Sequence, residues 1–139
     1  MMQCTTNNIL SEPEHFCSIA PTVVTAEGDQ RWYVDGKLHC DTGPAIKKHN
    51  GDRLWYKHGQ VHRDAGPAAE YHNGNHAWYC NGELHRVGGP AIIWDGKWDG
   101  SNVIAWYLHN RNYSCIHAYC DAAGITGVDR TIFILKWCD

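Results

Sequence analysis

The chain has 139 residues, and its 12 Lys and Arg against 15 Asp and Glu give a formal net charge of -3. This length fits one compact domain or one short repeat array, so a second independent domain is not expected. The nearly balanced charge provides no field that would attract a phosphate backbone or anionic lipid, which argues against duplex DNA and membranes as partners.

Residues 1–19 show no usable periodicity and are predicted to be an N-terminal cap or irregular segment. Met1–Leu10 has neither a basic n-region nor an apolar h-region, and no stretch of the chain approaches the about 18 apolar residues of a membrane span. The seven cysteines are an odd number without a C-x-x-C pair, a pattern typical of reduced thiols. We therefore expect a cytoplasmic protein.

Residues 20–113 contain a tandem repeat of 23 residues. Trp32-Tyr33, Trp55-Tyr56 and Trp78-Tyr79 recur at this interval, and Trp106-Tyr107 follows 28 residues after the third pair. Other positions keep the same phase: Gly36, Gly59 and Gly82; His39, His62 and His85; and Gly-Pro-Ala at 43–45, 66–68 and 89–91. Self-similarity at such a period is the signature of a repeat architecture.

Each unit carries two turn signals. One is the series Asp35-Gly36, His58-Gly59 and Asn81-Gly82, and the other is Asn50-Gly51 and Asn73-Gly74. Such pairs favour type I′ hairpin turns, in which both central residues have positive φ. Short runs rich in aromatic or β-branched residues lie between the turns. The predicted fold is therefore mainly β, with tandem antiparallel hairpins in an elongated sheet or solenoid.

Alternation along a strand places each Trp and the Tyr that follows it on opposite faces of the sheet. We expect one face to carry the structural Trp32, Trp55, Trp78 and Trp106 and the other to carry the tyrosines. The array then has a column of tryptophans and a column of tyrosines.

The repeat resembles the MORN family, whose units have the same length and a Gly-Lys-x-His turn, as in residues 36–39. It looks more like the variant with the signature W-Y-x-x-G-x-x-H-R-x-x-G-P-A, which residues 62–68 and 85–91 match. The first unit departs from it, with Cys40 in place of Arg. This variant is familiar from proteins of bacteriophages and large DNA viruses. The resemblance implies a viral accessory protein in the host cytoplasm that acts on a host factor, with an anti-defence role as one possibility.

Residues 114–139 depart from the repeat and are predicted to form a C-terminal helical cap, which solenoids need at their ends. Ser114 can N-cap a helix over residues 115–123 that is closed by Gly124. Thr126 begins a segment with capping-box character before residues 130–137, for which helix is favoured over strand.

The repeated His39, His62 and His85 invite interpretation as metal ligands or acid–base groups. Equivalent residues of a two-strand repeat lie about 9–10 Å apart, too far to share one ion. A structural role, in which the imidazole bonds a backbone group of the adjacent loop, is the simpler prediction. Cys115, His117 and Cys120 point in different directions on a helix, so no metal site is predicted there either.

Arg63 and Arg86 are the candidate ligand-facing charges, because a guanidinium can hold a phosphate or carboxylate in bidentate fashion. Ion pairs with acids such as Asp64 or Glu83, or plain solvent exposure, are the alternative. A five-residue insertion lengthens the loop at residues 94–102, which contains Trp94, Trp98 and Asp99. A loop longer than the equivalent loops of the other units can determine which partner is bound. Trp98 either anchors such a partner or packs back on the sheet.

We therefore predict a non-enzymatic binding module for a host protein, without cofactor or metal. The predicted contact residues are Trp94, Trp98, Asp99, Arg63, Arg86, Tyr56 and Tyr79. The alternative is a homo-oligomer that encloses a signalling nucleotide, with bases on Trp or Tyr and phosphate on Arg. A hydrolase using the histidine column is a third hypothesis, against which we note that no carboxylate or nucleophile recurs with these histidines.

Overall fold

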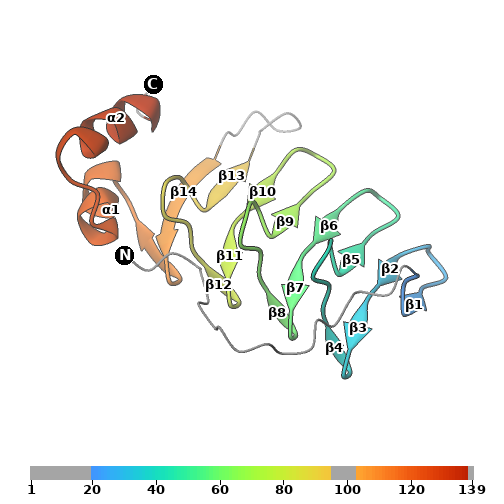
Figure 1. Cartoon of the computed structure of the whole chain (residues 1–139). Coiled ribbons are helices and arrows are strands. Elements are labelled where there is room, and N and C mark those ends of the chain that lie inside the picture. Colours follow the sequence, from blue (N-terminus) through green and yellow to red (C-terminus); the bar gives the residue numbers. More distant parts are fainter. Residues whose placement is uncertain (1–19, 95–102, 138–139) are drawn as a thin grey trace.

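The computed structural model describes residues 20–94 and 103–137. Figure 1 shows short strands following one another along an elongated, curved array, with helices α1 and α2 at one end. The strands are β1 (Val23–Val24), β2 (Gln30–Arg31), β3 (Tyr33–Val34), β4 (Lys37–Leu38), β5 (Ile46–Lys47), β6 (Arg53–Leu54), β7 (Tyr56–Lys57), β8 (Gln60–Val61), β9 (Ala69–Glu70), β10 (His76–Ala77), β11 (Tyr79–Cys80), β12 (Glu83–Leu84), β13 (Ile92–Trp94), β14 (Val103–Leu108) and β15 (Arg111–Tyr113). The helices are α1 (Ile116–Ala123) and α2 (Gly127–Trp137).

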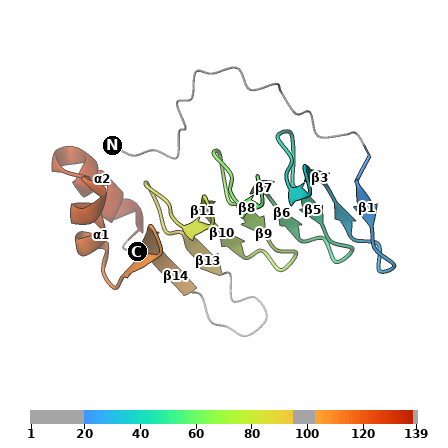
Figure 2. The ribbon, with the colours of Figure 1, turned by 90° about the horizontal axis from the view of Figure 1, so that it is seen from below.

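One antiparallel sheet runs through the whole array in the order β1-β2-β5-β6-β9-β10-β13-β14-β15. Three two-stranded hairpins, β3–β4, β7–β8 and β11–β12, lie beside it, one to each repeat unit. The view in Figure 2 shows the strands of the main sheet following one another from β1 toward the helices. The prediction of tandem antiparallel hairpins with a helical cap is confirmed.

Each repeat unit bends at its tryptophan, which lies between two short strands. The N–H of Trp32 donates to Ala45 in the main sheet at 2.9 Å, and its carbonyl accepts from the N–H of His39 in the side hairpin at 3.1 Å. Trp55 and Trp78 make the same pair of bonds, to Ala68 and His62 and to Ala91 and His85. The tryptophan is thus where the strand changes partner.

The two turn series have different geometries. Asp35 and Gly36 both have positive φ, at 49° and 72°, as a type I′ turn requires, and the pairs at 58–59 and 81–82 do the same. In the second series the glycine has positive φ but the preceding asparagine does not, and the N–H of Gly51 donates back to Lys48. This is the pattern of a three-residue hairpin loop, so the expectation of type I′ geometry was wrong for this series.

Adjacent units are joined through their turns and packed around small residues. The N–H groups of Gly59, Gly82 and Asn110 donate to carbonyls of the preceding unit at 2.8–2.9 Å. The alanines of the three Gly-Pro-Ala segments have no exposed surface. A larger side chain at these fully buried positions would have to displace its neighbours.

The two helices close the last hairpin over a cluster of aromatic and aliphatic residues. Its buried members are Trp106, Leu108, Ile116, Tyr119 and Cys120. The predicted first helix begins one residue later than expected, because Cys115 and not Ser114 is its N-cap, with Sγ accepting from the Ala118 N–H at 3.4 Å. Gly124 ends it in left-handed conformation, as predicted, and the second segment is the favoured helix.

Candidate functional site

The repeated histidines bond to the next unit through Nδ1. Nδ1 of His39 accepts from the His58 N–H at 3.0 Å, and Nδ1 of His62 and His85 accept from the N–H groups of Asn81 and His109 at 3.1 and 3.2 Å. All three side chains are buried. An accepting Nδ1 carries no proton, so the neutral ring has its proton on Nε2. Each histidine therefore satisfies the backbone of an adjacent turn.

The other ring nitrogen faces a carboxylate in the first two units. Nε2 of His39 lies 3.1 Å from Asp41, and Nε2 of His62 lies 3.0 Å from Asp64. A carboxylate does recur with these histidines, two residues later, so the statement that none does was wrong. In the third unit Val87 takes this position, and no bond to Nε2 of His85 is found in the described parts of the chain.

Arg63 and Arg86 lie flat on the tryptophans of their own units. The guanidinium carbon of each is 3.8 Å from the ring centroid, over Trp55 and Trp78 respectively. Nη1 of Arg63 donates to the Pro67 carbonyl at 3.0 Å and to Glu70 at 2.7 Å. The ion-pair partner is thus Glu70, and not Asp64 or Glu83 as the alternative had it.

Arg86 repeats this arrangement, donating to the Pro90 carbonyl at 3.0 Å. Burial lowers its pKa, an effect that Tyr119 opposes. Both guanidinium groups stack on a tryptophan and donate hydrogen bonds within the protein. These contacts do not support their predicted role in binding a ligand.

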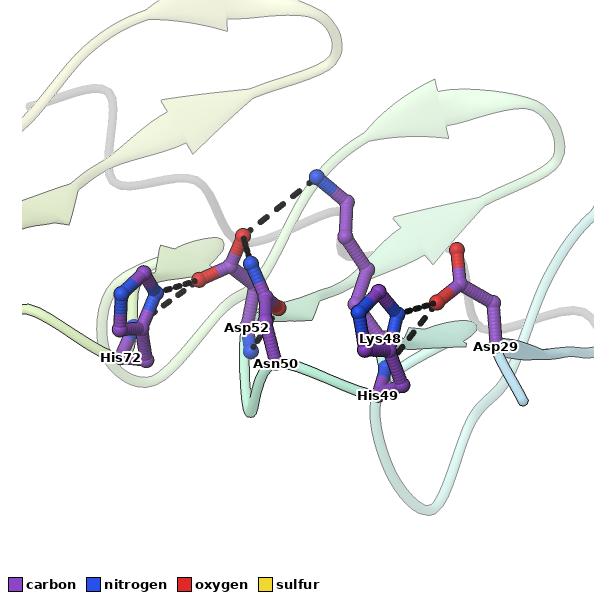
Figure 3. Close-up of polar contacts among 6 residues, drawn as sticks. All are labelled: Asp29, Lys48, His49, Asn50, Asp52 and His72. Atoms are coloured by element: carbon purple, nitrogen blue, oxygen red, sulfur yellow. Dashed lines mark hydrogen bonds and ion pairs between the residues drawn. The ribbon is translucent and has the colours of Figure 1, made fainter. Parts of the chain in front are cut away.

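A second column of paired side chains, absent from the sequence analysis, lies along the loops at one edge of the sheet (Figure 3). Oδ1 of Asp29 accepts from the backbone N–H of His49 at 3.0 Å and lies 3.0 Å from its Nδ1. Oδ1 of Asp52 makes the same two contacts with His72, at 3.0 and 2.9 Å. The recurrence of Gly-Asp at 28–29 and 51–52, with His at 49 and 72, was the available signal.

Asp52 is the most strongly held member of this column. Its other oxygen accepts from Asn50 at 3.1 Å and from Lys48 at 3.4 Å, and the residue is 5% exposed. Burial alone would raise the pKa of Asp52, but the hydrogen bonds from His72, Asn50 and Lys48 together lower it to about 2. Asp52 is therefore a charged group that ties two neighbouring loops together.

The tyrosines that follow the repeated tryptophans form a row on the array, which we call the tyrosine row: Tyr33, Tyr56, Tyr79 and Tyr107. All four are half-buried. Burial raises the pKa of Tyr79, and nearby Tyr71, Tyr56 and Tyr107 raise it further. Tyr79 therefore lies near Tyr56 and Tyr107, and each tyrosine of the row keeps part of its surface accessible.

The lengthened loop is described only at its start. Trp94 is 44% exposed and pairs across β13 and β14 with Val103, which is 37% exposed. Trp98 and Asp99 lie outside the described residues, so their predicted role stays a prediction.

The cysteines differ from the expectation of reduced thiols. Cys40 and Cys80 are disulfide-bonded, whereas Cys115 is an exposed thiol and Cys120 a buried one. Among residues 20–94 and 103–137, no group of three or more His, Cys, Asp or Glu could hold a metal ion. In the same ranges no helix is long and apolar enough to cross a bilayer.

No protein-family model, curated protein or solved structure matches this chain.

Proposed function

We propose that this protein is a non-enzymatic binding module that holds an extended segment of a partner protein along the tyrosine row. One observation carries the proposal. The histidines and arginines that recur with the repeat are engaged in contacts inside the fold, whereas the recurring tyrosines are only half-buried and keep accessible surface. Tyrosine is enriched at protein interfaces because it offers a large apolar surface together with a hydrogen-bonding hydroxyl.

The spacing of the row indicates what kind of segment fits. Each unit contributes two strands to the main sheet and one side hairpin, and the hairpin strands β3, β7 and β11 carry Tyr33, Tyr56 and Tyr79. The units repeat about every 9–10 Å along the main sheet, so we infer a similar spacing for the tyrosines on their hairpins. A polyproline II helix repeats every three residues, or about 9.3 Å. A proline-rich segment can therefore present a residue to each tyrosine in turn, as such segments do in other aromatic-lined grooves.

Titration of the isotope-labelled protein with a dodecaproline peptide, followed by NMR, tests this proposal. We expect chemical-shift changes along the tyrosine row with a Kd of about 1 mM or tighter, and none with a Gly-Ser peptide of the same length. The Tyr56→Ser/Tyr79→Ser variant should lose binding, whereas Tyr56→Phe/Tyr79→Phe should keep it, because the ring supplies most of the contact. Equal binding by all three proteins, or no binding by the wild type, would contradict the proposal.

The partner's origin in a host cell, and an effect on host defence, rest on the resemblance to viral repeat proteins alone. The predicted cytoplasmic location is opposed by the disulfides at Cys40 and Cys80, since disulfides persist mainly in oxidising compartments. The nucleotide alternative depended on Arg63 and Arg86, whose guanidinium groups already have partners.

The hydrolase hypothesis needs a histidine with a ring nitrogen available as a base. In His62 both nitrogens are occupied, by the Asn81 N–H and by Asp64. His39 and His85 likewise use Nδ1 to accept from a backbone N–H, so the unprotonated nitrogen of each repeated histidine is occupied. This favours the binding module over a hydrolase that uses the histidine column.

A further inference from the structure

A cavity of about 590 Å³ lies where the array meets its cap. Residues from the third unit, from the last hairpin and from the C-terminal end of α1 line it, among them His85, Val87, Leu108, Arg111 and Tyr113. We call it the junction cavity. A volume in this range is that of a small-molecule site.

The junction cavity lies at the one repeated histidine whose unit has no aspartate two residues later. His39 and His62 each have a carboxylate about 3 Å from Nε2. At His85 the equivalent side chain is that of Val87, which has no polar atom and is 43% exposed. The third unit thus keeps the histidine and lacks the acidic partner that the other two units supply.

His85 is a donor in a fixed position. It is 8% exposed, and its Nδ1 accepts from the His109 N–H, so its proton is on Nε2. Its ring lies 4.3 Å from that of His109. Burial lowers the pKa of His85, as does His109, while Glu83 opposes them. A neutral imidazole therefore remains available to donate from Nε2 at neutral pH.

The rest of the lining suits a carboxylate with an apolar body. Arg111 brings a positive charge, with its guanidinium carbon 5.4 Å from the centre of the Tyr113 ring. Glu83, the nearby acid, is paired with Nδ1 of His109 at 3.1 Å. Val87 and Leu108 provide apolar walls. The carbonyl end of α1, which carries partial negative charge, forms the wall that the carboxylate should avoid.

The cap holds the third-unit loop in place beside the cavity. The hydroxyl of Tyr119, from α1, donates to the carbonyl of Arg86 and lies 3.3 Å from that of Gly89. Tyr119 has no exposed surface. Val87 is therefore carried by a segment that is fixed on both sides, and the site is formed before any ligand arrives.

We propose that the junction cavity binds a small organic carboxylate, whose carboxyl group takes the place of the missing aspartate at Nε2 of His85 and pairs with Arg111. The apolar part of the ligand then lies against Val87 and Leu108. This site is separate from the tyrosine row.

Phenylacetate is a suitable probe, with phenylacetamide as its uncharged match. NMR of protein labelled with ¹⁵N in its histidine rings should show a change at Nε2 of His85 on addition of phenylacetate, and no such change with phenylacetamide. Substitution Val87→Asp restores the sequence of the second unit and supplies an internal carboxylate. It should weaken phenylacetate binding at least about tenfold and raise the pKa of His85 in the absence of ligand.

Val87→Thr is the matched control, because it keeps the shape of valine without a charge. Its hydroxyl makes the apolar wall more polar, so it should weaken phenylacetate binding, but less than Val87→Asp does. Arg111→Gln should weaken binding while leaving the fold intact, since its side chain is exposed. Unchanged binding by Val87→Asp, or no response of His85 at about 50 mM phenylacetate, would overturn the proposal. Because the tyrosine variants leave this cavity intact, failure here is distinguishable from failure at the tyrosine row.

Discussion

Replacing Asp52 by Asn tests whether a buried charge holds two loops of the array together. The two side chains have the same shape, and Asn occupies the equivalent position, 75, of the next unit. The variant keeps an oxygen that can accept from the His72 N–H but loses the negative charge that His72, Asn50 and Lys48 stabilise. The comparison therefore isolates the contribution of the charge.

The magnitude follows from the pKa. A pKa lowered from 3.8 to about 2 corresponds to about 2 kcal/mol of stability at neutral pH, because one pH unit is worth about 1.4 kcal/mol. Since the folded pKa is the lower one, this stability is present above the unfolded pKa and is lost as the pH falls from about 5 through 2. Asp52→Asn should lower the free energy of unfolding at pH 7 by up to about 2 kcal/mol.

Urea unfolding followed by tryptophan fluorescence, at a series of pH values from 7 down to 2.5, measures this directly. We expect the difference in the free energy of unfolding between wild type and Asp52→Asn to disappear as the pH falls. Asp29→Asn is the matched control, because Asp29 makes the same two contacts with His49. Asp52 also accepts from Asn50 and Lys48, so Asp29→Asn should change the free energy of unfolding by less than Asp52→Asn does. Parallel wild-type and Asp52→Asn curves over this range would refute the assignment of a stabilising charge to Asp52.

Three further predictions concern the repeat itself. His62→Ala should lower the free energy of unfolding by about 2–4 kcal/mol, because it leaves a backbone N–H of the next unit unpaired in a buried site. A loss below about 0.5 kcal/mol in urea unfolding would contradict this structural role. Arg63→Lys should cost about 1 kcal/mol, because a lysine cannot stack flat on Trp55 while donating to two oxygens, and Arg63→Met would show how much of the loss is packing. Reduction with dithiothreitol should lower the melting temperature, and the Cys40→Ser/Cys80→Ser variant should be insensitive to the reductant; a wild type equally insensitive would show that these disulfides contribute no stability.

Repetition made the architecture predictable. The period of 23 residues, the Trp-Tyr pairs and the Asp35-Gly36 type of turn together predict hairpins in register, because each signal implies the same local geometry three times. The second turn series was assigned the wrong geometry, since Asn-Gly serves both in type I′ turns and in longer loops where the glycine alone has positive φ.

The contacts between units were harder to predict. Asp52 and His72 are 20 residues apart, and Asp29 and His49 have the same separation. In the sequence such a pair looks like two unrelated positions, because only the fold brings the two loops together. The stacking of Arg63 on Trp55 likewise depends on the bend of the strand at the tryptophan, for which the sequence offers no separate signal. The disulfides at Cys40 and Cys80 could not be found from spacing, because pairing depends on proximity in space.

The histidine contacts also bear on how such an array changes its length. His39, His62 and His85 each present an imidazole acceptor to a turn N–H of the unit that follows. This one contact is therefore the same at each of the three steps, so a duplicated unit would find the same histidine acceptor and turn donor in its neighbours. Gain or loss of a whole unit would change the length of the tyrosine row in increments of one tyrosine while leaving the cap and its contacts unchanged, so the length of the proposed binding surface could change without a change of fold.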